Sequence, residues 1–164
     1  MRTYNNLKPA VPPKEITDFK QMLETNSEVY NDRIQYIFKE DGEMKELTFT
    51  EFGAKVKAFT TFLYEKGLNG KRIAITGDTS PYWMVAFYAA VISGGVAVPL
   101  DRELDPDQMT EFIKIAECSA IVYTASVADK VEGEIANLPD LSNFFINKSL
   151  YFGNILYIIS TNRY

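Results

Sequence analysis

Histidine is absent from this chain of 164 residues, and cysteine occurs only once, as Cys118. Because histidine is the commonest general base and the commonest metal ligand, its absence excludes Ser-His-Asp catalysis and zinc catalysis by this chain alone. A single cysteine forms no intrachain disulfide, which favours a reducing compartment. Any catalysis by this chain must therefore rest on other side chains.

Positive charge is also scarce, with 17 Lys and Arg residues against 22 Asp and Glu residues. The net charge of −5 argues against a nucleic-acid partner, which usually requires a basic face. The uncharged stretch Tyr82–Leu100 is nearly long enough to cross a bilayer, but glycines and a proline interrupt it and its flanks are not positively charged. Residues 1–14 contain no secretory signal. We therefore expect a cytoplasmic protein without a membrane span.

Apolar residues make up 46% of the chain and aromatic residues 13%, which is enough to fill a core. Residues 1–15 contain three prolines and no periodicity, and we interpret them as an extended arm. Residues 16–150 have the length of one α/β domain. Residues 151–164 are apolar and β-branched, which is typical either of a fifth strand or of the altered end of a longer coding sequence.

The first elements after the arm are a helix and a hairpin. Thr17 is predicted to cap a short helix over residues 18–24, and residues 26–32 are polar and loop-like. Strand-forming residues at 33–38 and 46–49, separated by Asp41-Gly42, predict a β-hairpin.

A second helix is predicted from Glu51 to Lys66, with Thr50 as its cap and Gly67 as its stop. Its apolar residues recur at helical spacing and predict a buried stripe of Phe52, Val56, Phe59 and Phe62 or Leu63.

Short apolar strands then recur at regular spacing, at residues 72–76, 96–98, 120–123 and 144–146. Their centres, Ile73, Ala97, Ile121 and Phe145, are each 24 positions apart. The intervening helices begin at Ser80-Pro81, Asp105-Pro106 and Ser126, and the second is predicted to turn Met109, Phe112, Ile113 and Ala116 inward. Alternating strands and helices predict an α/β fold with a mostly parallel sheet and flanking helices, preceded by a short helix and a β-hairpin.

The stretch Val91–Asp101 joins a buried helix to one of these strands. Gly94 and Gly95 supply the backbone freedom that so short a turn requires. Residues 96–98 are apolar without alternation, which predicts a parallel strand covered on both faces. Pro99 then ends the strand, because it has no N–H to donate.

The polar loop after the first of these strands is a candidate phosphate site. Its candidate cofactor-binding residues are Thr76, Gly77, Thr79 and Ser80. Loops at this end of parallel strands often bind phosphate, and this one loosely resembles the flavin-phosphate loop of flavodoxins. Asp78 would repel a phosphate, however, and we favour the interpretation that the loop only caps the next helix.

Three further sets of residues have a chemical and a structural interpretation, and we favour the structural one for each. The acidic loop that follows Leu100 offers magnesium ligands or an acid–base pair, but also suits a solvated loop: Asp101, Arg102, Glu103, Asp105 and Asp107. The aromatic residues Tyr82, Trp83, Phe87 and Tyr88 suit a ligand pocket or the core. Cys118 is a reactive thiol or a small buried residue. No phosphate-binding glycine motif and no metal-ligand spacing occurs.

Four segments resemble, in order, motifs of the AMP-forming adenylate ligases, the superfamily of acyl- and aryl-CoA synthetases. Leu47-Thr48-Phe49-Thr50-Glu51-Phe52 resembles L-T/S-Y-x-E-L, with Phe in place of Tyr and of the last Leu. Val91–Asp101 resembles L-K-A-G-x-A-Y-V-P-L/I-D, with Ile-Ser in place of Lys-Ala. Residues 70–75 resemble G-D-R-V-A-I, and residues 79–83 resemble N-S-P-E-W. The resemblance covers about Ile16 to Ile146.

The resemblance implies the N-terminal subdomain of an enzyme that joins a carboxylic acid to AMP and then to coenzyme A. ATP, magnesium and coenzyme A are implied for such a parent enzyme, and a long-chain or other fatty acid is the acid we expect. The family's phosphate loop ending in P-K-G and its catalytic lysine are not found here, so we expect no catalytic residues, no metal and no activity from this chain alone. The alternatives are a non-catalytic module that forms homo-oligomers through an exposed sheet edge, or a flavodoxin-like flavin or nucleotide binder.

Overall fold

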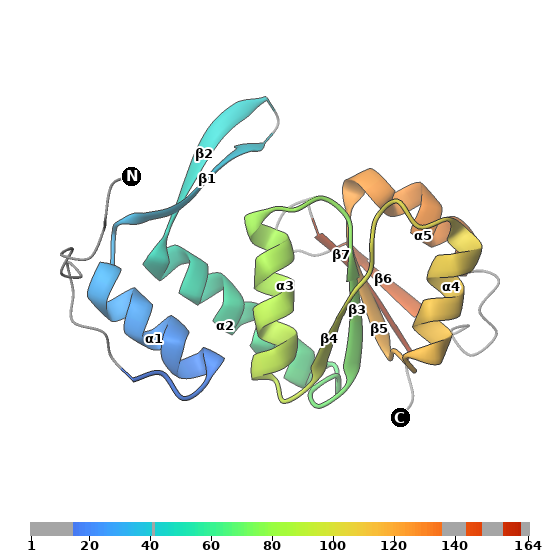
Figure 1. Cartoon of the computed structure of the whole chain (residues 1–164), viewed down its shortest axis with the longest axis horizontal. Coiled ribbons are helices and arrows are strands. Elements are labelled where there is room, and N and C mark those ends of the chain that lie inside the picture. The colour runs from blue at the N-terminus through green and yellow to red at the C-terminus, as the bar shows by residue number, and fades with distance from the viewer. Residues whose placement is uncertain (1–14, 41, 136–143, 149–155, 162–164) are drawn as a thin grey trace, which may run out of the picture.

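A computed structural model describes residues 15–40, 42–135, 144–148 and 156–161, with side chains described as far as Gly133. Figure 1 shows a helix and a hairpin on one side of a layered α/β body. Nearly all of the predicted arm and most of the predicted tail lie outside the described residues.

Helix α1 (Phe19–Tyr30) is longer than predicted, and its N-cap is Asp18, whose side chain accepts the N–H of Gln21 at 2.8 Å. The predicted cap at Thr17 is therefore wrong, and so is the predicted loop over residues 26–30, whereas residues 31 and 32 form a turn. Tertiary contact extends the helix, because Leu23 is buried in the main core and the Ser27 hydroxyl donates to the Phe49 carbonyl at 3.3 Å.

The predicted hairpin is confirmed as β1 (Ile34–Glu40) and β2 (Glu43–Thr48), and it projects beyond the helices in Figure 1. Helix α2 (Phe49–Glu65) follows, and its buried stripe is confirmed. The predicted cap at Thr50 is wrong. Thr48 is the cap because Glu51 lies three residues later, where its carboxylate accepts the N–H of Thr48 at 2.9 Å and completes a capping box.

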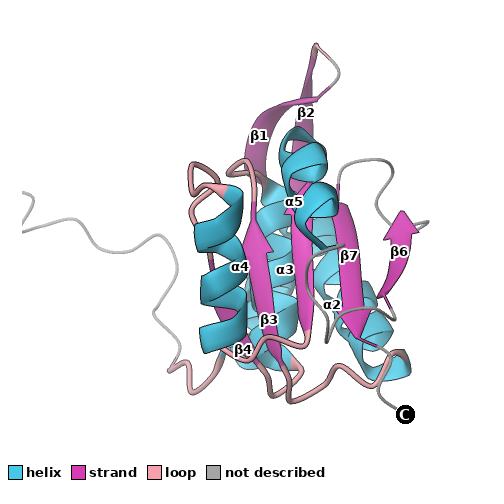
Figure 2. Ribbon diagram, turned by 90° about the vertical axis from the view of Figure 1, so that its right-hand side faces the viewer, coloured by secondary structure: helices cyan, strands magenta, loops and turns pink. Residues whose placement is uncertain are grey.

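The central sheet contains five strands in the order β4-β3-β5-β7-β6. Their bounds are β3 (Arg72–Thr76), β4 (Val96–Pro99), β5 (Ala120–Thr124), β6 (Phe144–Lys148) and β7 (Leu156–Thr161). Strand β3 pairs in parallel with β4 and β5, which confirms the parallel core. Strand β7 runs antiparallel to both β5 and β6, as the opposed arrows of β3 and β7 show in Figure 2. Part of the predicted tail is thus a strand, and it separates β6 from the parallel core.

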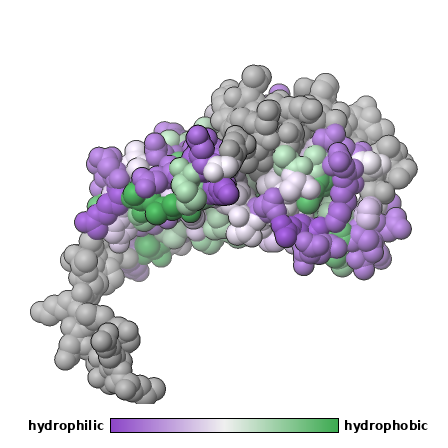
Figure 3. Space-filling view, turned by 90° about the horizontal axis from the view of Figure 1, so that it is seen from above, coloured by the Kyte–Doolittle hydropathy of each residue, from purple (hydrophilic) through white to green (hydrophobic). Residues whose placement is uncertain are grey.

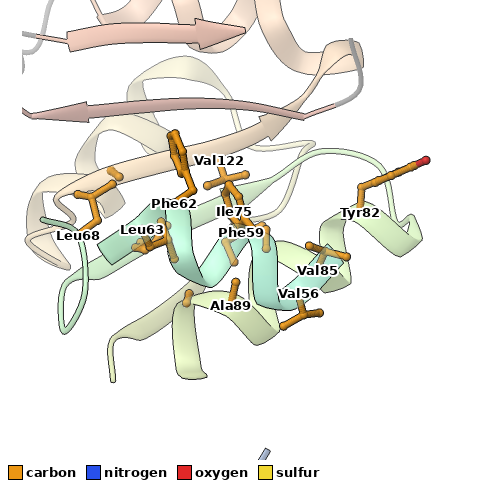
Figure 4. Close-up of a cluster of buried hydrophobic side chains, with 14 of the residues drawn as sticks. Val56, Phe59, Phe62, Leu63, Leu68, Ile75, Tyr82, Val85, Ala89 and Val122 are labelled. Carbon is orange, nitrogen blue, oxygen red and sulfur yellow. The ribbon is translucent and has the colours of Figure 1, made fainter. Parts of the chain in front are cut away.

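Helices cover both faces of this sheet. Helices α2 and α3 (Pro81–Ile92) pack on the face that carries Ile73 and Ile75, as Figure 4 shows for part of this core. Helices α4 (Pro106–Ile115) and α5 (Ala128–Ile135) lie on the opposite face, where Ala74 joins their buried side chains. This division follows from the alternation of side chains along a strand. In the described part of the chain, no helix is long and apolar enough to cross a membrane.

Two details of the α4 and α5 face differ from the predictions. Met109 and Ile113 are buried as expected, but Phe112 is 44% exposed because it lies beside their stripe and not on it. A 3-10 turn, η1 (Ala125–Val127), precedes α5, so the α-helix begins after Ser126.

The joint between α3 and β4 forms as predicted. Gly94 has φ +80°, and a Cβ on Gly95 would strike the Lys71 carbonyl, so the turn requires both glycines. Strand β4, however, lies at the edge of the sheet and Val96 is 52% exposed. The predicted cover on both faces is wrong, because a strand with only one neighbour leaves its outer side open.

Candidate functional site at the carboxyl ends of the parallel strands

Parallel pairing of β3 with β4 and β5 places the carboxyl ends of these three strands at one edge of the sheet. The loops at 76–80, 100–105 and 124–126 therefore meet there. Figure 3 views this end of the molecule from above, where hydrophilic residues border a smaller apolar patch. Ligands of open α/β sheets usually bind at this edge, so it is the candidate functional site.

Gly77 lets the first loop pass directly against the end of β5. Its φ is +115°, and a Cβ there would overlap the side chain of Thr124. The Asp78 N–H donates to the Thr124 hydroxyl at 3.0 Å, and the hydroxyls of Thr124 and Ser126 lie 2.9 Å apart. These contacts join two loops that are 46 residues apart in the chain.

Asp78 forms an ion pair with Arg102, which comes from the loop after β4. Hydrogen bonding from Ser126, together with Arg102, lowers the pKa of the Asp78 carboxyl below its ordinary value. Arg102 also donates to Glu103 at 2.9 Å. The carboxylate that argues against phosphate in the sequence is therefore paired with a cation in the structure.

Lys130 of α5 forms hydrogen bonds with the main chain of the same loop. Its Nζ donates to the carbonyl oxygens of Arg102 at 2.6 Å and Leu104 at 2.7 Å. The ammonium group thus satisfies two main-chain acceptors of an exposed loop, which restricts the conformations open to that loop.

Two carboxylates of the acidic loop stabilise local backbone structure. Asp101 accepts the N–H of Glu103 at 2.9 Å, and Asp105 caps α4 in a capping box with Gln108. Among the residues that the structure describes, no three acidic, histidine or cysteine side chains gather closely enough to hold a metal ion.

Two amides at the candidate phosphate loop are used internally, one within the loop and one in the first turn of α3. Thr124 accepts the Asp78 N–H, and Ser80 accepts the Trp83 N–H at 3.2 Å. Thr79 is exposed, whereas Thr76 is fully buried and its hydroxyl has no hydrogen-bond partner among the described atoms. This geometry supports the capping interpretation, and phosphate binding by these residues stays a prediction.

The aromatic residues of α3 contribute to the core. Tyr82 is 8% exposed, Trp83 stacks on Phe87 with ring centroids 5.8 Å apart, and Tyr88 meets Phe52 edge-on at 5.9 Å. Cys118 is half-buried, and burial raises the pKa of its thiol to about 11. The thiol is therefore protonated at neutral pH, which argues against a nucleophilic role.

The structure adds a groove of about 560 Å³ between α1 and α2. Its floor includes Leu23, Val56 and Ile92, and charged residues of both signs border it. A Cβ on Gly53 would overlap the Ser27 hydroxyl, so this glycine lets the two helices approach. The sequence offers no sign of this groove, because α1 is predicted to end before Ser27.

Sequence reasoning also missed the roles of Thr124 and Lys130. A threonine directly after a predicted parallel strand is a usable signal, since residues at that position border the adjoining loops. No comparable signal marks Lys130, because an exposed lysine on an amphipathic helix is ordinary.

Comparisons with known proteins show what this arrangement resembles. Residues 23–149 match the family model described as AMP-binding enzyme. The chain is 29% identical over 117 residues to the long-chain-fatty-acid–AMP ligase FadD32 of Mycolicibacterium smegmatis. That match covers 66% of this chain and 19% of FadD32, so the chain spans about a fifth of this relative.

Two solved structures are similar in fold. The anthranilate CoA ligase AuaEII, in complex with anthranoyl-AMP, superposes with a TM-score of 0.66 at 20% identity, over 75% of this chain and 23% of that chain. The N-terminal domain of FACL13 from Mycobacterium tuberculosis superposes with a TM-score of 0.65 at 21% identity, over 72% of this chain and 29% of that chain. The fold is therefore that of part of the N-terminal domain of acyl-CoA ligases, as the resemblance implies.

Proposed function

Because the chain belongs to the family of AMP-binding enzymes, we propose that it is the N-terminal structural part of an ATP-dependent acyl ligase. The parent reaction is the attack of a carboxylate on ATP, which gives an acyl-AMP and pyrophosphate, followed by transfer of the acyl group to the thiol of coenzyme A. The family match over residues 23–149 is the observation that carries this proposal.

A fatty acid is the acid substrate that we propose for the parent enzyme. The support is the similarity to FadD32, whose name states that it joins long-chain fatty acids to AMP. Carboxylic acid, ATP and coenzyme A are thus partners of the parent enzyme. Magnesium accompanies ATP in such an enzyme, held by the phosphates and by one or two carboxylates.

We further propose that the chain is inactive by itself and resides in the cytoplasm. The sequence contains no T-S-G-T-T-G and no P-K-G segment, and at the candidate site the Asp78 and Trp83 amides bind side chains of the chain itself. Nucleotidyl transfer requires groups that position phosphates and stabilise their charge. The single, half-buried Cys118 supports a reducing compartment.

Pyrophosphate release from the purified chain tests the proposed inactivity. With ATP, magnesium and a long-chain fatty acid, we expect a rate equal to that of a control without protein. Release that depends on the acid and stops when magnesium is chelated would contradict the proposal.

A non-catalytic assembly module of the same fold is the second candidate, and an open sheet edge favours it. Strand β4 is an edge strand with Val96 exposed, as self-association through a sheet edge would require. Its four residues and terminal Pro99 make it a short template for pairing. Light scattering at increasing concentration tests this candidate, since a strict monomer contradicts it.

A further inference from the structure

The hairpin has one face against the body and one face open to water. Tyr36 contacts Phe52 with ring centroids 5.2 Å apart, Phe38 contacts Tyr82 at 5.8 Å, and Leu47 is 4% exposed. Side chains alternate along each strand, so the neighbours of these residues point away from the body.

Four residues form the central part of this outer face. Ile37 lies opposite Glu46, and Lys39 lies opposite Met44. The two pairs form a square on the surface of the hairpin. Ile37 and Met44 occupy one diagonal of this square, and Lys39 and Glu46 occupy the other. We call these four residues the hairpin face.

Half of the hairpin face is apolar, although an open sheet face is usually polar. Ile37 is 62% exposed and Met44 is 67% exposed, while Ile34 at the base of β1 adds a third exposed apolar residue. In the part of the chain that the structure describes, neither Lys39 nor Glu46 belongs to an ion pair. Two apolar groups and two opposite charges are thus available for a partner.

We propose that the hairpin face is a docking surface for a second copy of this chain. The arrangement of the square is self-complementary. A twofold axis that lies in the face and passes through Ile37 and Met44 places each apolar residue on its counterpart. The same axis places Lys39 on Glu46 of the partner subunit, and Glu46 on the partner subunit's Lys39. Twofold interfaces require this kind of self-complementarity.

The size of the face sets the strength of the contact. A single hairpin buries far less than the roughly 800 Å² per partner of a standard interface. A weak dimer with a dissociation constant on the order of 100 µM is therefore expected. Lys39 and Glu46 then decide orientation, because like charges placed opposite each other disfavour a complex strongly.

Sedimentation velocity of the full chain over a wide concentration range tests the proposal. The weight-average sedimentation coefficient of the wild-type chain should rise with concentration. Lys39→Glu alone and Glu46→Lys alone should each weaken association about tenfold or more, since each places like charges together. The double variant, with both changes, should restore wild-type association, since it exchanges the two charges.

Lys57→Glu is the matched control, because it makes the same charge reversal at an exposed residue of α2 outside the hairpin face. It should leave association unchanged, and far-UV circular dichroism should show all variants folded. A wild-type chain that is monomeric at every concentration would overturn the proposal. So would two single variants that associate as strongly as the wild type, or a double variant that fails to restore association. None of these outcomes depends on catalysis, so they are independent of the proposed ligase function.

Discussion

The two faces of the central sheet are covered by helices of different character. On the face of α2 and α3, the core is large and rich in aromatic rings, and Phe52, Leu63 and Val85 are fully buried. On the face of α4 and α5, the core is smaller: Ala74, Met109, Ile113, Ile121, Tyr123, Val127 and Val131. Polar contacts border this second core, including a hydrogen bond of 2.9 Å from the Tyr123 hydroxyl to Glu132.

The part of the molecule that contributes most to the stability of the fold therefore differs from the part that holds the loops in place. Burial of apolar area is the main favourable contribution to folding, so the first face should contribute most of the stability. The groups that hold the loops at the carboxyl ends of the strands come from the end of β5 and from the elements that follow it: Thr124, Ser126 of η1 and Lys130 of α5. Substitutions in these two parts should therefore differ in how much they lower the free energy of unfolding and in which contacts they remove.

Leu63→Ala on α2 should have the largest effect, with a loss of about 4 kcal/mol in the free energy of unfolding. The side chain is fully buried, so its removal leaves a cavity in the larger core. Urea denaturation measures the loss. The neighbouring Tyr64→Ala is the control and should cost about 0.5 kcal/mol, because Tyr64 is 54% exposed. Equal losses would contradict this account of the core.

The same substitution on both faces compares them directly. Val85→Ala in α3 should cost about 2.5 kcal/mol, and Val131→Ala in α5 about 1.5 kcal/mol, because the smaller core relaxes more readily around a cavity. Both valines are buried, at 0% and 3% exposed, so exposure does not confound the comparison. A larger loss at Val131 would reverse the assignment of stability to the first face.

Gly77→Ala should cost about 2 kcal/mol in the free energy of unfolding, because alanine must adopt the positive φ of this position and its Cβ overlaps Thr124. Thermal and urea unfolding measure the change. The matched control is Gly133→Ala in α5, where the added Cβ meets nothing within 4 Å. That change should stabilise the chain by up to about 1 kcal/mol, since alanine is the better helix former. A neutral Gly77→Ala would show that the loop does not need its close contact with β5.

Asp78→Asn should have the smallest effect, a loss of less than about 1 kcal/mol at pH 7, because Asp78 and Arg102 are both about half exposed. Hydrogen bonding from Ser126, together with Arg102, lowers the pKa of Asp78 below its ordinary 3.8, so the folded state favours the ionised carboxylate. This contribution is complete above the ordinary pKa and is lost as the pH falls through the lowered one.

Urea denaturation at several pH values therefore measures a difference between Asp78→Asn and wild type that disappears in acid. High salt should also reduce the difference. A difference that persists unchanged below the lowered pKa would show that the asparagine acts through something other than charge.

Local signals in the sequence predicted most elements correctly. Ser80-Pro81 and Asp105-Pro106 mark the starts of α3 and α4, because a cap followed by proline at the first helical position acts within one turn. Failures occurred where distant contacts compete with local preference. The polar residues 26–30 are helical because α1 packs on α2, and Thr48 prevails over Thr50 through its partner Glu51.

The candidate site divides in the same way. The sequence identified the polar loop at 76–80 and the charged loop after Leu100, since both contain residues typical of such positions. It did not pair Asp78 with Arg102 or with Thr124, because those partners lie 24 and 46 residues away in the chain. The match to AMP-binding enzymes confirms the family that the motifs resemble.

The sequence by itself determined the elements, the α/β class, the parallel core and the family, because caps, glycines and apolar periodicity act over a few residues. Only the tertiary structure decided that β4 is an edge strand, that β7 lies between β5 and β6, and that Ile37 and Met44 face water. Strand order and exposure depend on which distant segments meet, and a local pattern contains no information about its neighbours in space.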